Sequence, residues 1–305
     1  MNSKFLPYGG LALLVLLMVW SGQRGGLAFA LGIPILAAVI WFGLIVLFCL
    51  LGDLSAAKGD YEGALQHYAR AEKLHCRRSQ LYCNRGKIFY RTGESEKAAT
   101  DFGKSLQLNP KQAEAYLGRG AILMATGQND RALTDYNQAI DHQLDLAEAH
   151  HSRGIIQMRL GNVTAARADF QRSIELKPDF FHPHYYLSLV QTCLGELDLA
   201  QRNIAQAIEL RPQYPPLYYV LGKLAVDYQT DLAAAQYSFE FGEKWEEQEG
   251  VDLYANDEYG YFYRGWAMHH QQNTAAASQD WFRAKDLATR HHNQLLLSQL
   301  KLILS

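Results

Sequence analysis

Histidines and cysteines are the residues of this chain that could bind a metal ion. The eleven histidines include three adjacent pairs, at 150–151, 269–270 and 291–292. Neighbouring residues on a helix point about 100° apart, so an adjacent pair cannot hold one ion from a single helix face. The four cysteines do not have the paired spacing of a zinc site. We therefore predict no metal site and no cofactor, and packing or surface roles for the histidines.

Catalytic motifs are also missing from the sequence. It contains no G-x-S-x-G elbow, no phosphate loop of the form G-x4-G-K-[ST] and no H-E-x-x-H pair. The glycine-rich stretch at 24–26 lies between two hydrophobic segments, where a turn explains it. The sequence predicts no catalytic residue and no small-molecule substrate, and we interpret the protein as not an enzyme. An enzyme with an unrecognised site stays as the least favoured alternative.

The charge balance argues against nucleic acid as a ligand. The chain has 29 basic and 31 acidic residues, and Lys4 and Arg24 both precede the first acidic residue, Asp53. The remainder of the chain therefore has a formal net charge of −4, whereas nucleic-acid binders present basic surfaces. Protein and lipid remain as the expected partners.

A strict period of 34 residues organises most of the chain. It is carried by a small residue, glycine in five units and Ser188 in another, and by an alanine twelve positions later in each unit. The glycines are Gly52, Gly86, Gly120, Gly154 and Gly222, and the alanines are Ala64, Ala98, Ala132, Ala166, Ala200 and Ala234. Such self-similarity predicts a solenoid of identical supersecondary units.

Further positions of the period fit a pair of antiparallel helices. Position 4 is aromatic or His and position 24 is usually large, which fills the space that small residues at positions 8 and 20 leave. A glycine at position 15, such as Gly93, suits a turn with positive φ, and a proline at position 32, such as Pro110, ends the second helix. This pattern resembles the tetratricopeptide repeat, and its style is similar to that of bacterial, in particular cyanobacterial, members.

The resemblance implies an all-α fold, a right-handed superhelical solenoid of about seven helix-turn-helix repeats over residues 45–291. The repeats start near residues 45, 79, 113, 147, 181, 215 and 258. Nine extra residues precede the last repeat, and we expect the stretch 243–258 to accommodate them as a longer second helix and a loop. Residues 285–305 are leucine-rich and predict a capping helix, whose surplus of apolar residues also allows a second contact.

Two hydrophobic segments precede the repeats and predict a transmembrane hairpin over residues 1–51. The second, residues 27–51, has no charge and would reach roughly 37 Å as a helix, enough for a bilayer core of roughly 30 Å. The first, residues 5–22, is shorter and contains Pro7. A signal peptide is the competing interpretation of the first segment, because Lys4 precedes its apolar run. The second segment overlaps the first repeat, so we expect one continuous helix that holds the repeats rigidly at the membrane surface.

The positive-inside rule gives the orientation. Lys4, the N-terminal amine and Lys58 lie on one side of the hairpin, and Arg24 alone lies in the turn. We therefore expect a two-pass integral membrane protein whose repeats face the cytoplasm. In that compartment free buried thiols are the expected state of the cysteines, although a bridge between Cys76 and Cys83 is geometrically possible.

The family resemblance also implies a partner-binding groove, lined by the first helix of each repeat at positions 2, 5, 9 and 12. In this chain those positions are mostly aromatic and aliphatic, as in many protein interfaces. The aromatic density rises after residue 180, so we favour the later repeats as the binding site. The predicted groove residues are Lys87, Tyr90, Leu117, Met124, His151, Met158, Tyr185, Leu189, Tyr219, Lys223, Phe262 and Trp266.

Two functional hypotheses follow from a membrane hairpin joined to such a groove. In the first, the protein is a scaffold or adaptor that binds protein partners in the groove and assists the assembly or stability of a membrane protein complex. In the second, it is a regulatory subunit of an envelope or polysaccharide-secretion machine. Co-purification with a synthase or transporter would favour the second hypothesis.

Overall fold

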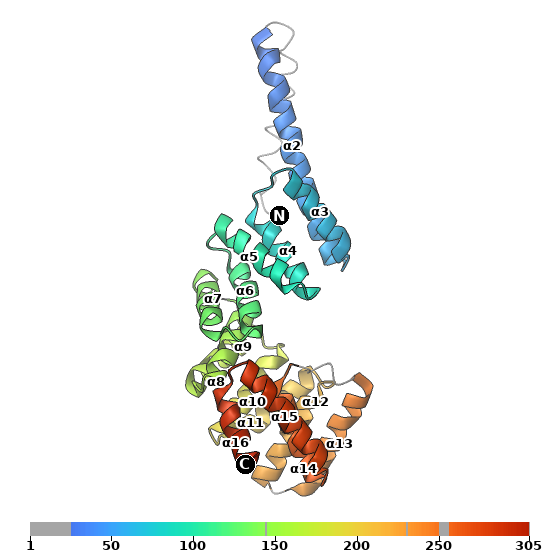
Figure 1. The fold of residues 1–305 in the computed structure, drawn as a ribbon, viewed down its shortest axis with the longest axis vertical. Coiled ribbons are helices and arrows are strands. Elements are labelled where there is room, and N and C mark those ends of the chain that lie inside the picture. The colour runs from blue at the N-terminus through green and yellow to red at the C-terminus, as the bar shows by residue number, and fades with distance from the viewer. Residues whose placement is uncertain (1–25, 144, 230, 250–255, 305) are drawn as a thin grey trace. The chain divides into compact units, whose positions relative to one another are not determined.

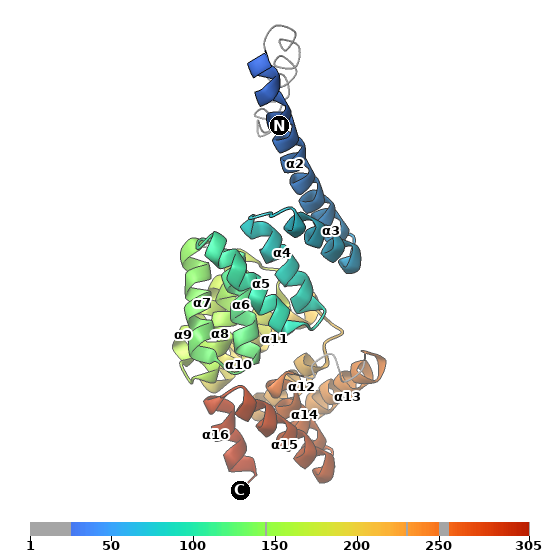
Figure 2. The ribbon, with the colours of Figure 1, turned by 45° about the horizontal axis from the view of Figure 1, so that its top comes forward.

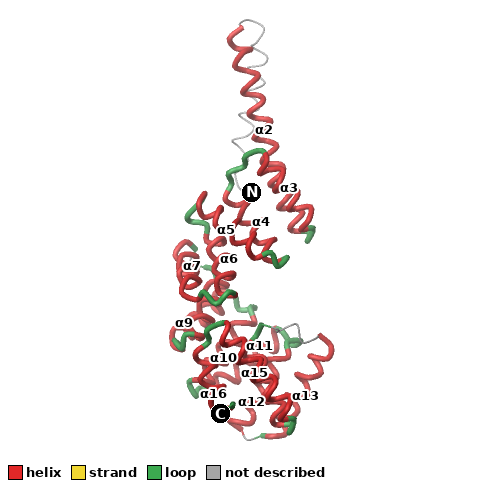
Figure 3. Tube along the Cα trace, viewed as in Figure 1, coloured by secondary structure: helices red, strands yellow, loops and turns green. Residues whose placement is uncertain are grey.

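The computed structural model describes residues 26–143, 145–229, 231–249 and 256–304. These residues form fifteen α-helices and one π-helix, and no strand occurs among them (Figure 3). The chain divides into two compact units, one ending at Asn109 and the other beginning at Pro110. The predicted all-α repeat architecture is confirmed.

The first unit contains the N-terminal helix and the first two repeats. Its helices are α2 (Gly26–Ala57), α3 (Tyr61–Lys73), α4 (Ser79–Arg91) and α5 (Ser95–Leu108). Helix α3 packs beside the C-terminal part of α2, and α5 packs beside α4 (Figure 1). Helix α2 runs without a break from the hydrophobic segment into the first repeat, as the overlap of the two patterns predicts.

The N-terminal helix therefore serves two purposes along its length. Ile45 and Cys49 are buried in the core of the first repeat, so the end of the predicted span 27–51 packs against protein. Over residues 34–57 the helix is long and apolar enough to cross a membrane by length and composition. It is the one such helix in the described part of the chain. The other half of the predicted hairpin, residues 5–22, lies outside the described residues.

In every repeat except the fifth, which has Ser188 instead, a glycine on the first helix faces an aromatic ring on the second. A Cβ atom built at Gly86 would lie 2.9 Å from Phe102, and one built at Gly154 would lie 2.8 Å from Phe170. Only a residue without a side chain lets the two helices approach this closely. The turn glycine Gly93 has φ +83°, as its position predicts.

A second pairing inside the repeats joins an arginine on the first helix to an aspartate on the second. Each arginine directly precedes the glycine and each aspartate directly precedes the aromatic residue. The pairs lie 2.6 to 3.3 Å apart and are Arg85–Asp101, Arg119–Asp135, Arg153–Asp169 and Arg264–Asp280. These charge-assisted hydrogen bonds fix the register of the two helices at the edge of the apolar interior.

The second unit contains the remaining repeats. Its helices are α6 (Ala113–Ala125), α7 (Asn129–His142), α8 (Ala147–Arg159), α9 (Val163–Leu176), α10 (Phe181–Cys193), α11 (Leu197–Leu210), α12 (Pro215–Leu224), α13 (Leu232–Glu249), α14 (Glu258–His270), α15 (Thr274–Arg290) and α16 (Gln294–Ile303). The π-helix η2 (Ala225–Gln229) follows α12. The predicted prolines Pro110, Pro178 and Pro212 each lie just after a second helix ends.

The sixth repeat departs from the predicted register by one residue. Gly222 faces Phe239, seventeen residues later, whereas Gly154 faces Phe170 after sixteen. The π-helix η2 accommodates the additional residue within the first helix of this repeat. As a result Ala235, only 2% exposed, takes the buried position that the period assigns to Ala234.

The seventh repeat consists of α14 and α15, which pack side by side like the helix pairs of the other repeats. Helix α13 is longer than the other second helices, as predicted for the insertion. Helix α14 packs mainly against α12, the first helix of the sixth repeat (Figure 2), and Arg264 on α14 also forms an ion pair with Glu246 on α13 at 3.1 Å. The capping helix α16 begins at Gln294, later than the predicted 285, and contacts α8 as well as α15.

Candidate functional site

The first unit has an open cleft between its two first helices, α2 and α4. The cleft has a volume of about 240 Å³. It is lined by Asp53, Ala56, Tyr61, Tyr68, Asn84, Lys87, Ile88 and Arg91. Lys87 belongs to the predicted groove, and Tyr90, from the next exposed turn of α4, is 42% exposed. These two predicted residues are therefore accessible to a partner.

A carboxylate organises this cleft. Asp53 accepts hydrogen bonds from the Tyr68 hydroxyl at 2.6 Å and from the Asn84 amide at 2.7 Å. Burial and the bond to Asp53 raise the pKa of Tyr68, so its hydroxyl stays a donor. Arg91 donates to the Tyr61 hydroxyl at 3.0 Å across the same cleft. The cleft is thus polar and of mixed charge, unlike the mostly apolar groove that the sequence predicts.

The corresponding face of the second unit is largely closed to solvent. Four of its predicted groove residues, Leu117, Met124, Lys223 and Trp266, are half-buried. The other six are buried and are His151, Met158, Tyr185, Leu189, Tyr219 and Phe262. Tyr219 is fully buried, and its hydroxyl donates to Glu246 at 2.5 Å. The role of these ten residues in partner binding stays a prediction.

The beginning of α14 covers the first helix of the fifth repeat. Asp257, which caps α14, accepts hydrogen bonds from the hydroxyls of Tyr185 at 3.1 Å and Tyr214 at 3.0 Å. The ring of Tyr259 stands edge-on to Tyr186, with ring centroids 6.4 Å apart. Burial, and then the neighbouring charge of Glu258, raise the pKa of Asp257 to about 6.

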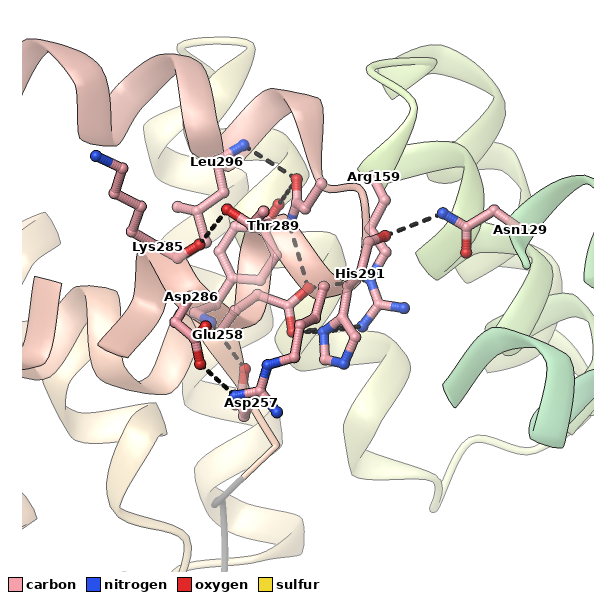
Figure 4. A network of polar contacts seen from close by, with 12 residues as sticks. Asn129, Arg159, Asp257, Glu258, Lys285, Asp286, Thr289, His291 and Leu296 are labelled. Atoms are coloured by element: carbon pink, nitrogen blue, oxygen red, sulfur yellow. Dashed lines mark hydrogen bonds and ion pairs between the residues drawn. The ribbon is translucent and has the colours of Figure 1, made fainter. Parts of the chain in front are cut away.

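A buried ionic network joins α14 and the α15–α16 turn to α8, as Figure 4 shows. The guanidinium of Arg159 donates to both Glu258 oxygens, at 3.0 and 3.3 Å. His291 Nδ1 lies 3.0 Å from Glu258 Oε2, and the Asn293 amide donates to Oε1 at 3.2 Å. Burial alone would raise the pKa of Glu258, but Arg159 and His291 lower it to about 2.

Two further contacts attach the C-terminal helices to the earlier repeats of this unit. The Asn129 amide donates to the backbone carbonyl of His291 at 3.0 Å, and Gly127 lies so close to Arg290 that a Cβ atom would be 2.6 Å from its carbonyl oxygen. Gln299 on α16 lies 3.8 Å from the Cys193 sulfur on α10. Helices α14–α16 therefore occupy the side of α8 and α10 that the sequence assigns to a partner.

The sequence pattern gives no signal for this closed face. Arg159, Glu258 and His291 join segments 99 and 132 residues apart, and none of them occupies a conserved position of the 34-residue period.

The histidines of this unit pack against aromatic side chains. The ring of His151 lies 4.9 Å from Phe180 and 5.5 Å from Tyr186, centroid to centroid. Burial lowers the pKa of His151 well below its usual value and that of His182 to about 4, so both rings are neutral. No group of three metal-ligating side chains occurs in the part of the chain that the structure describes.

The repeats match known family models. Residues 86–127 and 120–161 match the model described as TPR repeat, and residues 147–180 match the model described as Tetratricopeptide repeat. Residues 86–180 are tetratricopeptide repeats. This segment includes the contacts of Gly86 with Phe102 and of Gly154 with Phe170, so the same interior geometry is found on both sides of the boundary after Asn109.

Solved structures share the architecture over a longer stretch. A tetratricopeptide repeat protein from Parabacteroides merdae is 19% identical, with a TM-score of 0.57, covering 86% of this chain and 100% of its own. Pseudomonas aeruginosa pilF is 14% identical, with a TM-score of 0.53, covering 74% of this chain and 97% of its own. No curated protein matches this sequence. At these identities the similarity concerns the fold, an all-helical solenoid built of tetratricopeptide repeats.

Proposed function

We propose that the protein is a membrane-anchored scaffold that binds protein partners and assists the assembly or stability of a membrane protein complex. The observation that carries this proposal is the exposed apolar part of α2. Residues 34–44 are exposed on every side of the helix, apart from half-buried Val39, and include Ile40 (55% exposed), Trp41 (46%) and Phe42 (50%).

Such a surface is unfavourable in water. A helix that is apolar all round belongs in a protein core or a membrane, and contiguous exposed apolar patches of this size mark interaction sites. Because α2 is continuous with the first repeat, a bilayer around residues 34–44 would hold the repeats close to its surface. The two-pass topology and the cytoplasmic orientation are part of this proposal, and both depend on residues 5–22.

The partner-binding part of the proposal rests on the open cleft of the first unit. Tyr90 and Arg91 lie on the exposed side of α4 and are types of side chain that anchor interfaces, and Lys87 adds a second cation beside them. A partner segment could reach them without any change in the repeats. It would reach Tyr185, whose hydroxyl is bound by Asp257, only if the start of α14 moved away from the face that it covers.

Site-specific photocrosslinking in native membranes tests the binding surface. A photoreactive residue at position 90 should capture a discrete partner, and Lys87→Ala should reduce that product. A photoreactive residue in place of Tyr237, which is 66% exposed on α13, is the matched control. Equal products from both positions, or none from position 90, would contradict binding through this cleft.

Extraction with alkaline carbonate tests the anchor separately. The full chain should remain in the membrane pellet, and a variant with Ile40→Lys, Trp41→Lys and Phe42→Lys should appear in the supernatant, because charges at the centre of a span are strongly unfavourable. Release of the unaltered chain by carbonate would contradict the anchor.

A further inference from the structure

Four basic side chains surround the point where α2 leaves the first repeat. They are Arg70 and Lys73 at the end of α3, and Arg77 and Arg78 in the turn before α4, and we refer to them as the basic collar. All four are exposed. In the sequence they follow the end of the hydrophobic segment, Leu51, by nineteen residues or more, so their position beside it is a product of the fold.

The antiparallel packing of α2 and α3 brings the collar close to the point where α2 leaves the first repeat. The guanidinium of Arg70 lies 5.9 Å from the ring centroid of Phe48, and Cys76 lies 3.8 Å from Cys49, sulfur to sulfur. Residues 48 and 49 lie within about one helical turn of Ile45, the buried residue that directly follows the exposed stretch 34–44. The collar therefore lies where the helix emerges.

The collar is not neutralised within the protein. Among the described residues, no carboxylate lies within ion-pair distance of its four members. The acidic residue of the segment, Glu72, is bound to Arg85 at 2.6 Å and to Lys104 at 3.5 Å. Arg77 and Arg78 line a cleft of about 450 Å³ beside Cys49, whose walls also include Asp53. Asp53 already accepts hydrogen bonds from the Tyr68 hydroxyl and the Asn84 amide.

The length of the helix gives the depth at which the collar would meet a bilayer. From Gly26 to Ile45, where burial in the repeat begins, α2 has twenty residues and spans about 30 Å, the thickness of a bilayer core. If this stretch fills the core, the collar lies in the layer of lipid headgroups. Lysine and arginine at that level attract anionic lipids, whereas zwitterionic lipids give no net attraction.

We infer that the basic collar binds the phosphate groups of anionic phospholipids. The first repeat would then contact the bilayer surface directly, in addition to being anchored by α2. This inference rests on the proposed membrane anchor. It adds a lipid preference that hydrophobic anchoring alone does not require. Because phosphate contacts of this type are ionic, the preference weakens as salt rises.

Native mass spectrometry of the detergent-solubilised full chain tests the inference. The protein is mixed with equal amounts of phosphatidylglycerol and phosphatidylcholine that have the same acyl chains, and the retained lipids are counted. Each arginine should favour the anionic lipid by roughly five-fold. The variant Arg77→Gln/Arg78→Gln should therefore lower the ratio of retained lipids at least about five-fold. The control Lys58→Gln/Lys97→Gln removes the same charge elsewhere in this unit and should leave the ratio unchanged.

The outcomes separate the two proposals. A protein that resists carbonate extraction but shows no preference for phosphatidylglycerol would overturn the lipid inference alone, while a protein released by carbonate would overturn the anchor as well. Equal losses in the two double variants would show a general charge effect and would also count against the collar. Complete displacement of phosphatidylglycerol by inorganic phosphate would assign the site to a free anion instead.

Discussion

The two units of this protein have the same repeat interior, but they differ in whether the face formed by their first helices is open to solvent. In the first unit, Asp53, Lys87 and Arg91 line a cleft that is open to solvent. In the second unit, Leu189 occupies the position of the period that Asp53 and Lys87 occupy in the first unit, and it is only 1% exposed. The period of a repeat protein thus determines how each unit packs internally, while contacts outside the period decide which face remains available to a partner.

The largest expected effect comes from breaking the network that closes the second unit. Glu258→Ala would leave the buried guanidinium of Arg159 without its counter-charge, and we expect the free energy of unfolding to fall by about 3–5 kcal/mol. Urea denaturation of the detergent-solubilised chain, followed by tryptophan fluorescence, measures this loss. Glu175→Ala removes an exposed ion pair with Arg172 and should change stability by less than about 1 kcal/mol. Similar losses in both variants would refute the closed face.

The comparison predicts a smaller but clear contrast between a predicted groove residue of the second unit and one of the first. Leu189→Ala should lower the stability by about 2–5 kcal/mol, because a buried leucine leaves a cavity. Tyr90→Ala, at an exposed position of the first groove, should change it by less than about 0.5 kcal/mol. The same denaturation experiment reports both. A tolerated Leu189→Ala would mean that the second groove is open in solution.

The shared interior predicts equal effects in the two units. Gly86→Ala and Gly154→Ala each place a Cβ atom within 3 Å of an aromatic ring, and each should lower stability by about 1–3 kcal/mol. Gly103→Ala is the control, since nothing lies within 4 Å of its added Cβ, and it should stabilise α5 by about 0.5–1 kcal/mol. A loss confined to one unit would argue against a common interior.

The smallest effect is a pH dependence that belongs only to the closed unit. The raised pKa of Asp257 means that the folded protein binds this proton more tightly than the unfolded chain does. Its contribution to stability is therefore present below about pH 4 and is lost as the pH rises through about 6. Asp257→Asn should reduce the slope of the stability profile over this interval, as urea midpoints between pH 4 and 7.5 would show, and Asp280, whose pKa burial also raises to about 6, should account for the remaining slope. Glu258, with its pKa near 2, titrates below this window.

The period was sufficient to predict the repeats and their turns, because each contact involved is local. Gly93 and the other turn glycines adopt positive φ where expected, and Gly86 and Phe102 meet within one unit. The Arg85–Asp101 pair was missed, although its recurrence at a spacing of sixteen residues is a signal that a search for charged pairs would find. The one-residue shift before Phe239 depends on η2, which leaves no mark in the period.

The 34-residue period could not predict whether the groove is accessible to a partner. Arg159 and Glu258 are 99 residues apart, and their pairing depends on α14 packing against α12 after the insertion. Tyr185 was predicted as a partner contact from its helical position, and that position is also where the chain's own C-terminal helices bind. A periodic pattern identifies a face but does not identify its occupant.

A thiol crosslink between α10 and α16 tests the closed face most directly. Cys193 is exposed at the end of α10, and Gln299 lies beside it, so the variant Gln299→Cys should be bridged to Cys193 by a short bismaleimide. A cysteine in place of Lys244 on α13, which does not pack against α10, is the control. The account predicts a high yield of the 193–299 crosslink by peptide mapping and a sharp reduction when Glu258→Ala is added. A yield no greater than that of the control would contradict it.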